Sequence, residues 1–171
     1  MTESEATLYG KEHERVCLTK LENVLGVKIA GGKKVVPRGH SWLVCVPDGL
    51  LEDAIVEVKC PFKCREKSFE TLAETDQNFC LKLKAGGELG LSHDHDYYYQ
   101  VQGMLNMMDR QVCYFAVWSP SQFHYQVIEK DQELWQTVMF PKLLEFYRFT
   151  GYETFTTLLS HHNQQETCPR Q

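Results

Sequence analysis

Hydrophobic residues recur at helical spacing in three parts of the chain, which predicts three amphipathic helices. The first stripe stops at Gly26, and the second follows a polar cap at Ser92 or Asp94. The third follows Asp131, and we expect Pro141 to kink it. The stripe residues are Glu14, Leu18, Leu21 and Leu25, then Tyr97, Val101, Met104, Leu105 and Met108, then Leu134, Trp135, Val138, Leu143, Phe146 and Tyr147.

Shorter apolar runs between these helices predict β-strands. The run at 111–118 is apolar almost throughout, as in a central strand. The run at 123–128 alternates between apolar and polar residues, like a strand with one face exposed to water. Three glycines make residues 84–92 the expected loose connection. The order of elements predicts an α/β (α+β) fold, a sheet with helices against its faces. The expected strands are residues 27–30, 34–36, 42–46, 54–60, 111–118 and 123–128.

Length and composition restrict the class of protein. The chain has 171 residues, 43% of them hydrophobic, which is enough for one domain with its own core. No apolar run approaches the ~18 residues of a membrane helix, and the acidic start is unlike a signal peptide. Seven cysteines in such a chain are expected to be reduced, so we expect an intracellular protein, cytoplasmic or nuclear, without a membrane partner. The net charge of −5 argues against bulk coating of nucleic acid but leaves a local basic groove open.

Polar residues suited to chemistry gather on two neighbouring predicted strands. Asp48 lies at the turn after one strand, and Glu57 and Lys59 belong to the next. Because strand side chains alternate between faces, Val58 can face the core while Glu57 and Lys59 share the other face. If the strands pair as a hairpin across residues 49–53, the carboxylates of Asp48 and Glu57 can meet.

Two convergent carboxylates are suited to a hard divalent cation. Mg²⁺ takes oxygen ligands and keeps several waters, so two carboxylates and a backbone carbonyl, here that of Val58, are sufficient. Such a cation activates a bound water and stabilises charge on a phosphoryl oxygen, and the Lys59 ammonium can orient that water or offset charge. The set is suited to phosphodiester hydrolysis. The plainer alternative is a turn aspartate beside a solvated Glu-x-Lys pair.

Two further polar residues lie on the hydrophobic stripes. Glu14 belongs to the first stripe, and Gln100 lies among the apolar residues of the second. An unpaired buried carboxylate or amide costs about 2 kcal/mol or more, so a shared polar site between the helices and the sheet would satisfy both. Alternatively, each lies at the edge of its stripe and reaches water.

Four segments, in this order, resemble a known family. They are Tyr-Gly-Lys-Glu-His-Glu at 9–14, Pro-Asp-Gly-Leu at 47–50, Val-Glu-Val-Lys-Cys-Pro-Phe at 56–62 and Tyr-Tyr-Tyr-Gln-Val-Gln at 97–102. As a set they resemble the YqaJ-type viral recombinases, the phage lambda exonuclease group of the PD-(D/E)xK nuclease superfamily. The resemblance implies a restriction-endonuclease-like core, a central mixed β-sheet flanked by helices, and an exonuclease that cuts DNA with Mg²⁺ or Mn²⁺.

The same resemblance implies roles for individual residues. By motif, Asp48 and Glu57 would be metal ligands and Lys59 the catalytic lysine. Glu14 would be an acidic partner near the metal ions, and Gln100 a glutamine that supports the site. Phage relatives degrade one strand of duplex DNA from its 5′ end and form ring-shaped trimers, so a homo-oligomer is an expectation here.

The resemblance also sets the expected domain organisation. We expect residues 1–160 to form one YqaJ-like nuclease domain without the family's usual N-terminal segment, followed by a flexible polar tail at 161–171. The missing segment leaves a second function open, that of a catalytically inactive or truncated relative that binds DNA or a protein. A third candidate is a phosphodiesterase of the same fold that acts on RNA or branched DNA.

A basic cluster follows the strand that carries Glu57. Lys63, Arg65 and Lys67 are expected to form a rim that binds DNA phosphates, with an ordinary solvated loop as the alternative. A zinc site is a weaker alternative, because the spacing of its ligands does not match a C-x₂-C pair. Those ligands would be Cys60, Cys64 and Cys80 with His93 or His95.

Overall fold

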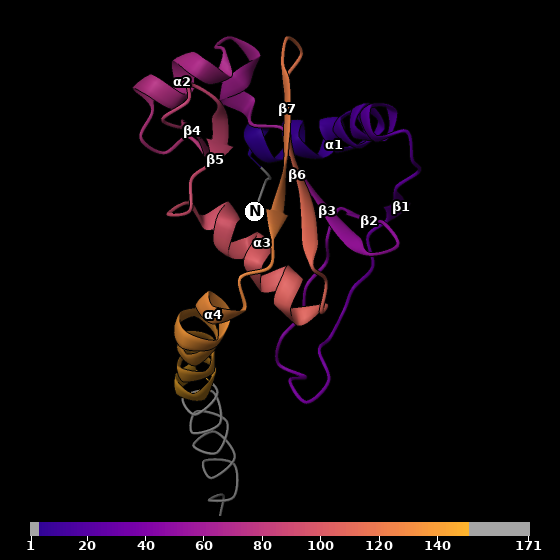
Figure 1. Cartoon of the computed structure of the whole chain (residues 1–171), viewed down its shortest axis with the longest axis vertical. Helices are drawn as coiled ribbons and strands as arrows, with labels where there is room; N and C mark the ends of the chain where they lie inside the picture. The colour runs from indigo at the N-terminus through magenta and orange to yellow at the C-terminus, as the bar shows by residue number, and fades with distance from the viewer. Residues whose placement is uncertain (1–3, 151–171) are drawn as a thin grey trace, which may run out of the picture. The chain divides into compact units, whose positions relative to one another are not determined.

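A mixed β-sheet of five strands organises most of the chain (Figure 1). In this computed structural model, which describes residues 4–150, the strand order is β1-β2-β3-β6-β7. Strands β3 and β6 pair in parallel and the other neighbours pair antiparallel, so the predicted mixed sheet is confirmed. The strands are β1 (Ala30–Gly31), β2 (Gly49–Leu50), β3 (Ala54–Lys59), β6 (Val112–Trp118) and β7 (Phe123–Glu129).

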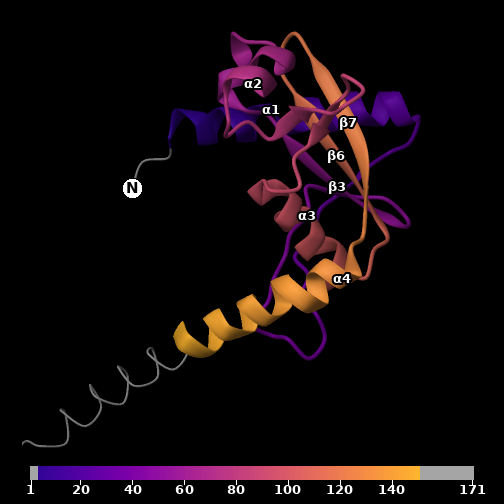
Figure 2. The ribbon, with the colours of Figure 1, turned by 60° about the vertical axis from the view of Figure 1, so that its left-hand side comes forward.

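Two helices cover opposite faces of this sheet (Figure 2). Helix α1 (Glu5–Leu25) packs on the face that carries Val56 and Val58. Helix α3 (Asp96–Met107) lies on the other face, and its Tyr97 ring lies 6.4 Å from that of Phe115 in β6. The predicted fold class, a sheet flanked by helices, is therefore confirmed. Among residues 4–150, no helix has both the length and the apolar character needed to cross a membrane.

The ends of these helices follow ordinary capping chemistry. As predicted, α1 ends at Gly26, whose φ of 69° is left-handed and is readily adopted by glycine. Helix α3 begins after His95, so the predicted caps at Ser92 and Asp94 are wrong. The reason is tertiary: the Ser92 N–H still donates to the carbonyl of Cys80, which keeps this residue in the preceding hairpin.

A small subdomain, which the sequence did not predict, lies between β3 and α3. Its antiparallel hairpin β4–β5 occupies part of the stretch expected to be loose, and Gly87 in its turn has a φ of 79°. The buried rings of Phe69 and Phe79 pack together in its core. Its elements are the 3₁₀ turn η1 (Phe62–Arg65), α2 (Phe69–Thr75), β4 (Leu81–Leu83) and β5 (Leu89–Leu91).

The segment before β2 contains less strand than predicted. Of the expected strand at 27–30 only Ala30 belongs to a strand, β1, and the expected strands at 34–36 and 42–46 are reduced to one bridge between Val35 and Cys45. Glycines and prolines interrupt the segment, which limits continuous pairing.

The chain divides into two compact units after Asp131. The second unit is helical from Gln132 to residue 150: α4 (Gln132–Leu134) continues through the π-helical turn η2 (Trp135–Met139). The third predicted helix is therefore confirmed over these residues. The predicted tail at 161–171 lies outside the described residues.

Candidate active site

The hairpin of β2 and β3 brings two carboxylates together. Gly49 pairs with Val56, so Asp48, one residue before, lies beside Glu57. The Val58 N–H donates to Oδ2 of Asp48 over 2.8 Å, which fixes this carboxylate at the end of the hairpin. The pairing confirms the hairpin expected from the sequence.

Glu57 is the most deeply buried acidic group of the site, with 2% of its surface exposed. Its Oε1 accepts hydrogen bonds from Lys59 Nζ at 2.5 Å and Gln100 Nε2 at 2.7 Å. Its Oε2 is buried and has no hydrogen-bond partner. Burial raises the pKa of Glu57 to about 7, with Asp48 adding to the effect and Lys59 opposing it. The solvated Glu-x-Lys pair of the plainer alternative is therefore absent, because α3 covers this face.

Lys59 lies between an anion and an aromatic ring. Its ammonium bonds Glu57 and also lies 4.5 Å from the centroid of the Tyr97 ring. Burial by itself lowers the pKa of Lys59, but Glu57, followed by Asp48, outweighs burial, so the net pKa is raised. The side chain thus stays a cation at neutral pH, although only 17% of it is exposed.

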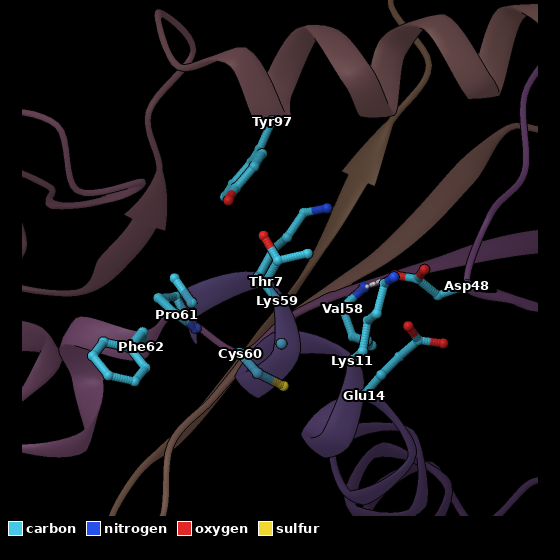
Figure 3. A pocket seen from close by; sticks show the side chains of 12 residues that line it. Thr7, Lys11, Glu14, Asp48, Val58, Lys59, Cys60, Pro61, Phe62 and Tyr97 are labelled. Carbon is cyan, nitrogen blue, oxygen red and sulfur yellow. Dashed lines mark hydrogen bonds between the residues drawn. The ribbon is translucent and has the colours of Figure 1, made fainter. Parts of the chain in front are cut away.

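A pocket of about 400 Å³ opens beside these groups (Figure 3). The carboxylates of Asp48 and Glu14 extend to the same side of it, and Tyr97 reaches down from α3. Burial, and then the charge of Asp48, raise the pKa of Glu14, which indicates that these two acids interact. The lining residues are Ala6, Thr7, Gly10, Lys11, Glu14, Asp48, Val58, Lys59, Cys60, Pro61, Phe62 and Tyr97.

The two glutamines of α3 have different positions. Gln100 lies on the exposed edge of the helix, not within the core-facing stripe, yet its amide reaches Glu57 as a member of the site. Gln102 is fully buried and binds the backbone on both sides: it donates to the carbonyl of Glu129 and accepts from the N–H of Asp131, each at 2.8 Å. Its bonds make Gln102 a structural link between α3 and the end of β7.

The donor set fits a hard divalent cation that keeps several waters. Asp48 and Glu57 provide carboxylate oxygens, Val58 adds a backbone carbonyl, and the unpartnered Oε2 of Glu57 is a buried acceptor that lacks a positive partner. Across residues 4–150, no three His, Cys, Asp or Glu side chains are clustered as a metal-binding group. The fit therefore rests on the pair Asp48 and Glu57, with Glu14 on the same side of the pocket as Asp48. The cysteines and histidines considered for zinc form no such cluster either.

The predicted basic rim divides into two kinds of residue. Lys63 is engaged in the small subdomain, where it bonds Asp76 at 2.6 Å. Arg65 is exposed, and its guanidinium lies 3.4 Å from the centroid of the Phe62 ring, at the edge of the pocket. Lys67 is exposed as well.

Two residues of the pocket were missed as members of the site. Lys11 lies three residues before Glu14 on α1, and Tyr97 lies three residues before Gln100 on α3. Residues three apart share one face of a helix, so this spacing was the available signal. Tyr97 forms a wall of the pocket.

Comparison with known proteins agrees with this architecture. No curated protein sequence matches the chain. An alkaline exonuclease from Laribacter hongkongensis superposes with a TM-score of 0.66 at 20% identity, over 92% of this chain and 77% of that chain. The same exonuclease in complex with dAMP gives 0.63 at 18% identity, with the same coverage. A phage-related exonuclease from Haemophilus somnus 129PT gives 0.56 at 14% identity, over 78% of this chain and 66% of that chain.

At these identities the structural likeness shows the fold. The sequence itself carries the family signal, because the model of the YqaJ-like viral recombinase domain matches residues 1–111. That match spans more than half of the chain and contains Glu14, Asp48, Glu57, Lys59 and Gln100. The chain belongs to the YqaJ-like viral recombinase domain family.

Proposed function

We propose that this protein is a Mg²⁺- or Mn²⁺-dependent DNA exonuclease that hydrolyses phosphodiester bonds of linear DNA. One observation carries the proposal: the β2–β3 hairpin places the carboxylates of Asp48 and Glu57 together beside the ammonium of Lys59, with one buried oxygen of Glu57 left unpartnered. Membership in the YqaJ-like family and the fold of the exonuclease neighbours support it.

Each residue of the site has a distinct part in this proposal. Asp48, Glu57 and the Val58 carbonyl would hold the ion, with Glu14 beside them, and the bound ion supplies a Lewis acid for the phosphoryl group. The Lys59 ammonium, partly withdrawn from water, stabilises negative charge that develops on the phosphate. Gln100 donates to one oxygen of Glu57, which leaves the other available.

Substrate contacts are assigned to the basic residues after β3. Arg65, stacked on Phe62 at the edge of the pocket, and the exposed Lys67 would contact phosphates. Lys63, which is paired with Asp76, would act mainly by holding the subdomain that carries them. A homo-oligomer, as in the phage relatives, is also proposed, and sedimentation would measure it.

The inactive binding module is the less favoured alternative, because all five predicted site residues are present and Lys59 and Gln100 both contact Glu57. A cytoplasmic or nuclear location is part of the proposal. It is supported by the six free cysteines among residues 4–150, all of them buried.

The proposal is tested by digestion of end-labelled linear, closed circular and single-stranded DNA with Mg²⁺, Mn²⁺ or a chelator. We expect wild-type protein to degrade linear DNA only with a divalent ion and to spare closed circles. Asp48→Asn and Lys59→Ala should each lower the rate about 100-fold or more. The controls Asp53→Asn, in the same hairpin, and Lys20→Ala, on the exposed side of α1, should cleave normally. Equal cleavage by Asp48→Asn and wild type would refute the assignment.

A further inference from the structure

Tyr97 stands opposite the proposed catalytic lysine. It lies one turn before Gln100 on α3, and its ring extends into the pocket above Lys59 (Figure 3). The Lys59 nitrogen lies 4.5 Å from the ring centroid, within the distance of a cation–π contact. Helix α3 thus presents two side chains to the active strand: Gln100 bonds Glu57, and Tyr97 covers Lys59.

The Tyr97 ring has its own support. It lies 6.4 Å from the buried ring of Phe115 and 4.6 Å from that of His95, the cap of α3. An aromatic ring has only two side-chain torsions, so these contacts hold it with little loss of conformational entropy. Lysine, by contrast, has a flexible four-carbon stem and needs external restraint to keep its ammonium in one place.

An aromatic ring and a carboxylate restrain an ammonium group in different ways. Glu57 attracts Lys59 but uses one of its three N–H donors and draws the nitrogen toward the base of the site. The face of the Tyr97 ring attracts the positive charge without accepting a strong hydrogen bond, so the remaining N–H groups can be directed at a substrate. This attraction is strengthened by the low exposure of the lysine side chain, 17%.

We propose that Tyr97 is a positioning residue for Lys59: its ring holds the ammonium over the pocket in the orientation that serves phosphodiester cleavage. This inference rests on the proposed nuclease function. Of the three consecutive tyrosines at 97–99, Tyr97 is the one whose position fits this role. Tyr98 is buried against His93, with rings 4.1 Å apart, and Tyr99 is exposed and lies outside the pocket.

The kinetic test compares three variants with wild type on linear DNA. Tyr97→Leu should lower kcat about tenfold with KM changed less than twofold, because the lost ring acts on the chemical step through Lys59. Tyr97→Phe, which keeps the ring, should restore most of that loss. Tyr99→Leu, the same change two residues along the helix, should leave kcat unchanged. Equal losses in Tyr97→Phe and Tyr97→Leu, or a loss confined to KM, would overturn the proposal.

Coupling to Lys59 is measured in a double-mutant cycle. If Tyr97 acts through Lys59, adding Tyr97→Leu to Lys59→Ala should lower the residual rate by less than twofold. A further tenfold loss in that background would show that Tyr97 acts independently and would contradict the proposal. Thermal unfolding of each variant identifies a loss caused by unfolding, and in that case the cycle is measured below the transition of the least stable variant.

A second readout does not depend on nuclease activity. In protein with ¹³C-labelled lysine, the ε-methylene protons of Lys59 should show an upfield ring-current shift that Tyr97→Phe keeps and Tyr97→Leu removes. The absence of this shift in wild type would refute the contact itself. If the shift is present and the wild-type protein cleaves no DNA under any divalent ion, the nuclease function and the catalytic part of Tyr97 both fail, although the contact stands.

Discussion

Replacing Glu57 with glutamine should remove the pH dependence that this residue gives to folding. Burial raises the pKa of Glu57 from 4.5 to about 7 in the folded protein. Between these two values the unfolded chain releases a proton that the folded protein retains, so raising the pH favours unfolding. Each pKa unit is worth about 1.4 kcal/mol, so the ionised group lowers the free energy of unfolding by about 3 kcal/mol above pH 7.

Denaturant unfolding without divalent ions, from pH 4.5 to pH 8, measures this effect. The stability of wild type relative to Glu57→Gln should fall by about 3 kcal/mol over that range, because glutamine stays neutral while it can still accept the bonds of Lys59 and Gln100. Glu22→Gln is the matched control. The Ile29 N–H donates to Glu22 and lowers its pKa, so this carboxylate stabilises the fold above its ordinary pKa and loses that effect in acid. Between pH 4.5 and pH 8 the difference in stability between wild type and Glu22→Gln should therefore stay nearly constant, because the effect of Glu22 is lost only below its ordinary pKa of 4.5.

A divalent ion should remove the loss of stability that ionisation of Glu57 causes. Mn²⁺ at pH 8 should stabilise wild type more than Glu57→Gln, because a bound ion favours the ionised carboxylate. If wild type and Glu57→Gln kept a constant difference in stability from pH 4.5 to pH 8, the inferred burial of an ionisable group at this position would be wrong.

Two further predictions concern the hairpin and the rim. In Gly49→Ala the added Cβ would collide with the Ile29 side chain, so we expect a loss of about 1–3 kcal/mol in the free energy of unfolding, measured by denaturant titration; unchanged stability would contradict the tight packing there. Arg65→Ala should weaken DNA binding, and the dependence of the binding constant on salt concentration should fall by the amount expected for about one phosphate contact. Lys63→Ala should instead lower the melting temperature of the protein, because it loses the bond to Asp76. A loss of DNA affinity in Lys63→Ala together with a loss of stability in Arg65→Ala would contradict the division of the rim.

The sequence pattern was sufficient to predict those helices and strands whose position is set by residues within or next to them. The stripe of α1 and its terminal Gly26, and the apolar run of β6, depend on neighbouring residues and were predicted correctly. Residues 27–46 depend instead on which backbone groups find partners elsewhere in the fold, and there only β1 and one bridge formed. The hairpin β4–β5 was missed because glycines in its turn obscured the short apolar alternation.

The site shows the same division between local and tertiary information. Alternation along β3 placed Glu57 and Lys59 on one face, and the adjacent turn placed Asp48 beside them. Alternation could not reveal that α3 buries this face, because coverage depends on packing between elements distant in sequence. The ring of Tyr97 over Lys59 is a contact of this kind, between residues 38 positions apart.

The central claim is that Asp48, Glu57 and the carbonyl of Val58 share one divalent ion. A crystal of the protein grown with Mn²⁺ would test it directly through the anomalous signal of the metal. We predict a peak about 2.1 Å from an oxygen of Asp48, from Oε2 of Glu57 and from the Val58 carbonyl. Manganese bound elsewhere in the pocket, or a site in which Asp48 and Glu57 do not touch the same ion, would contradict the account.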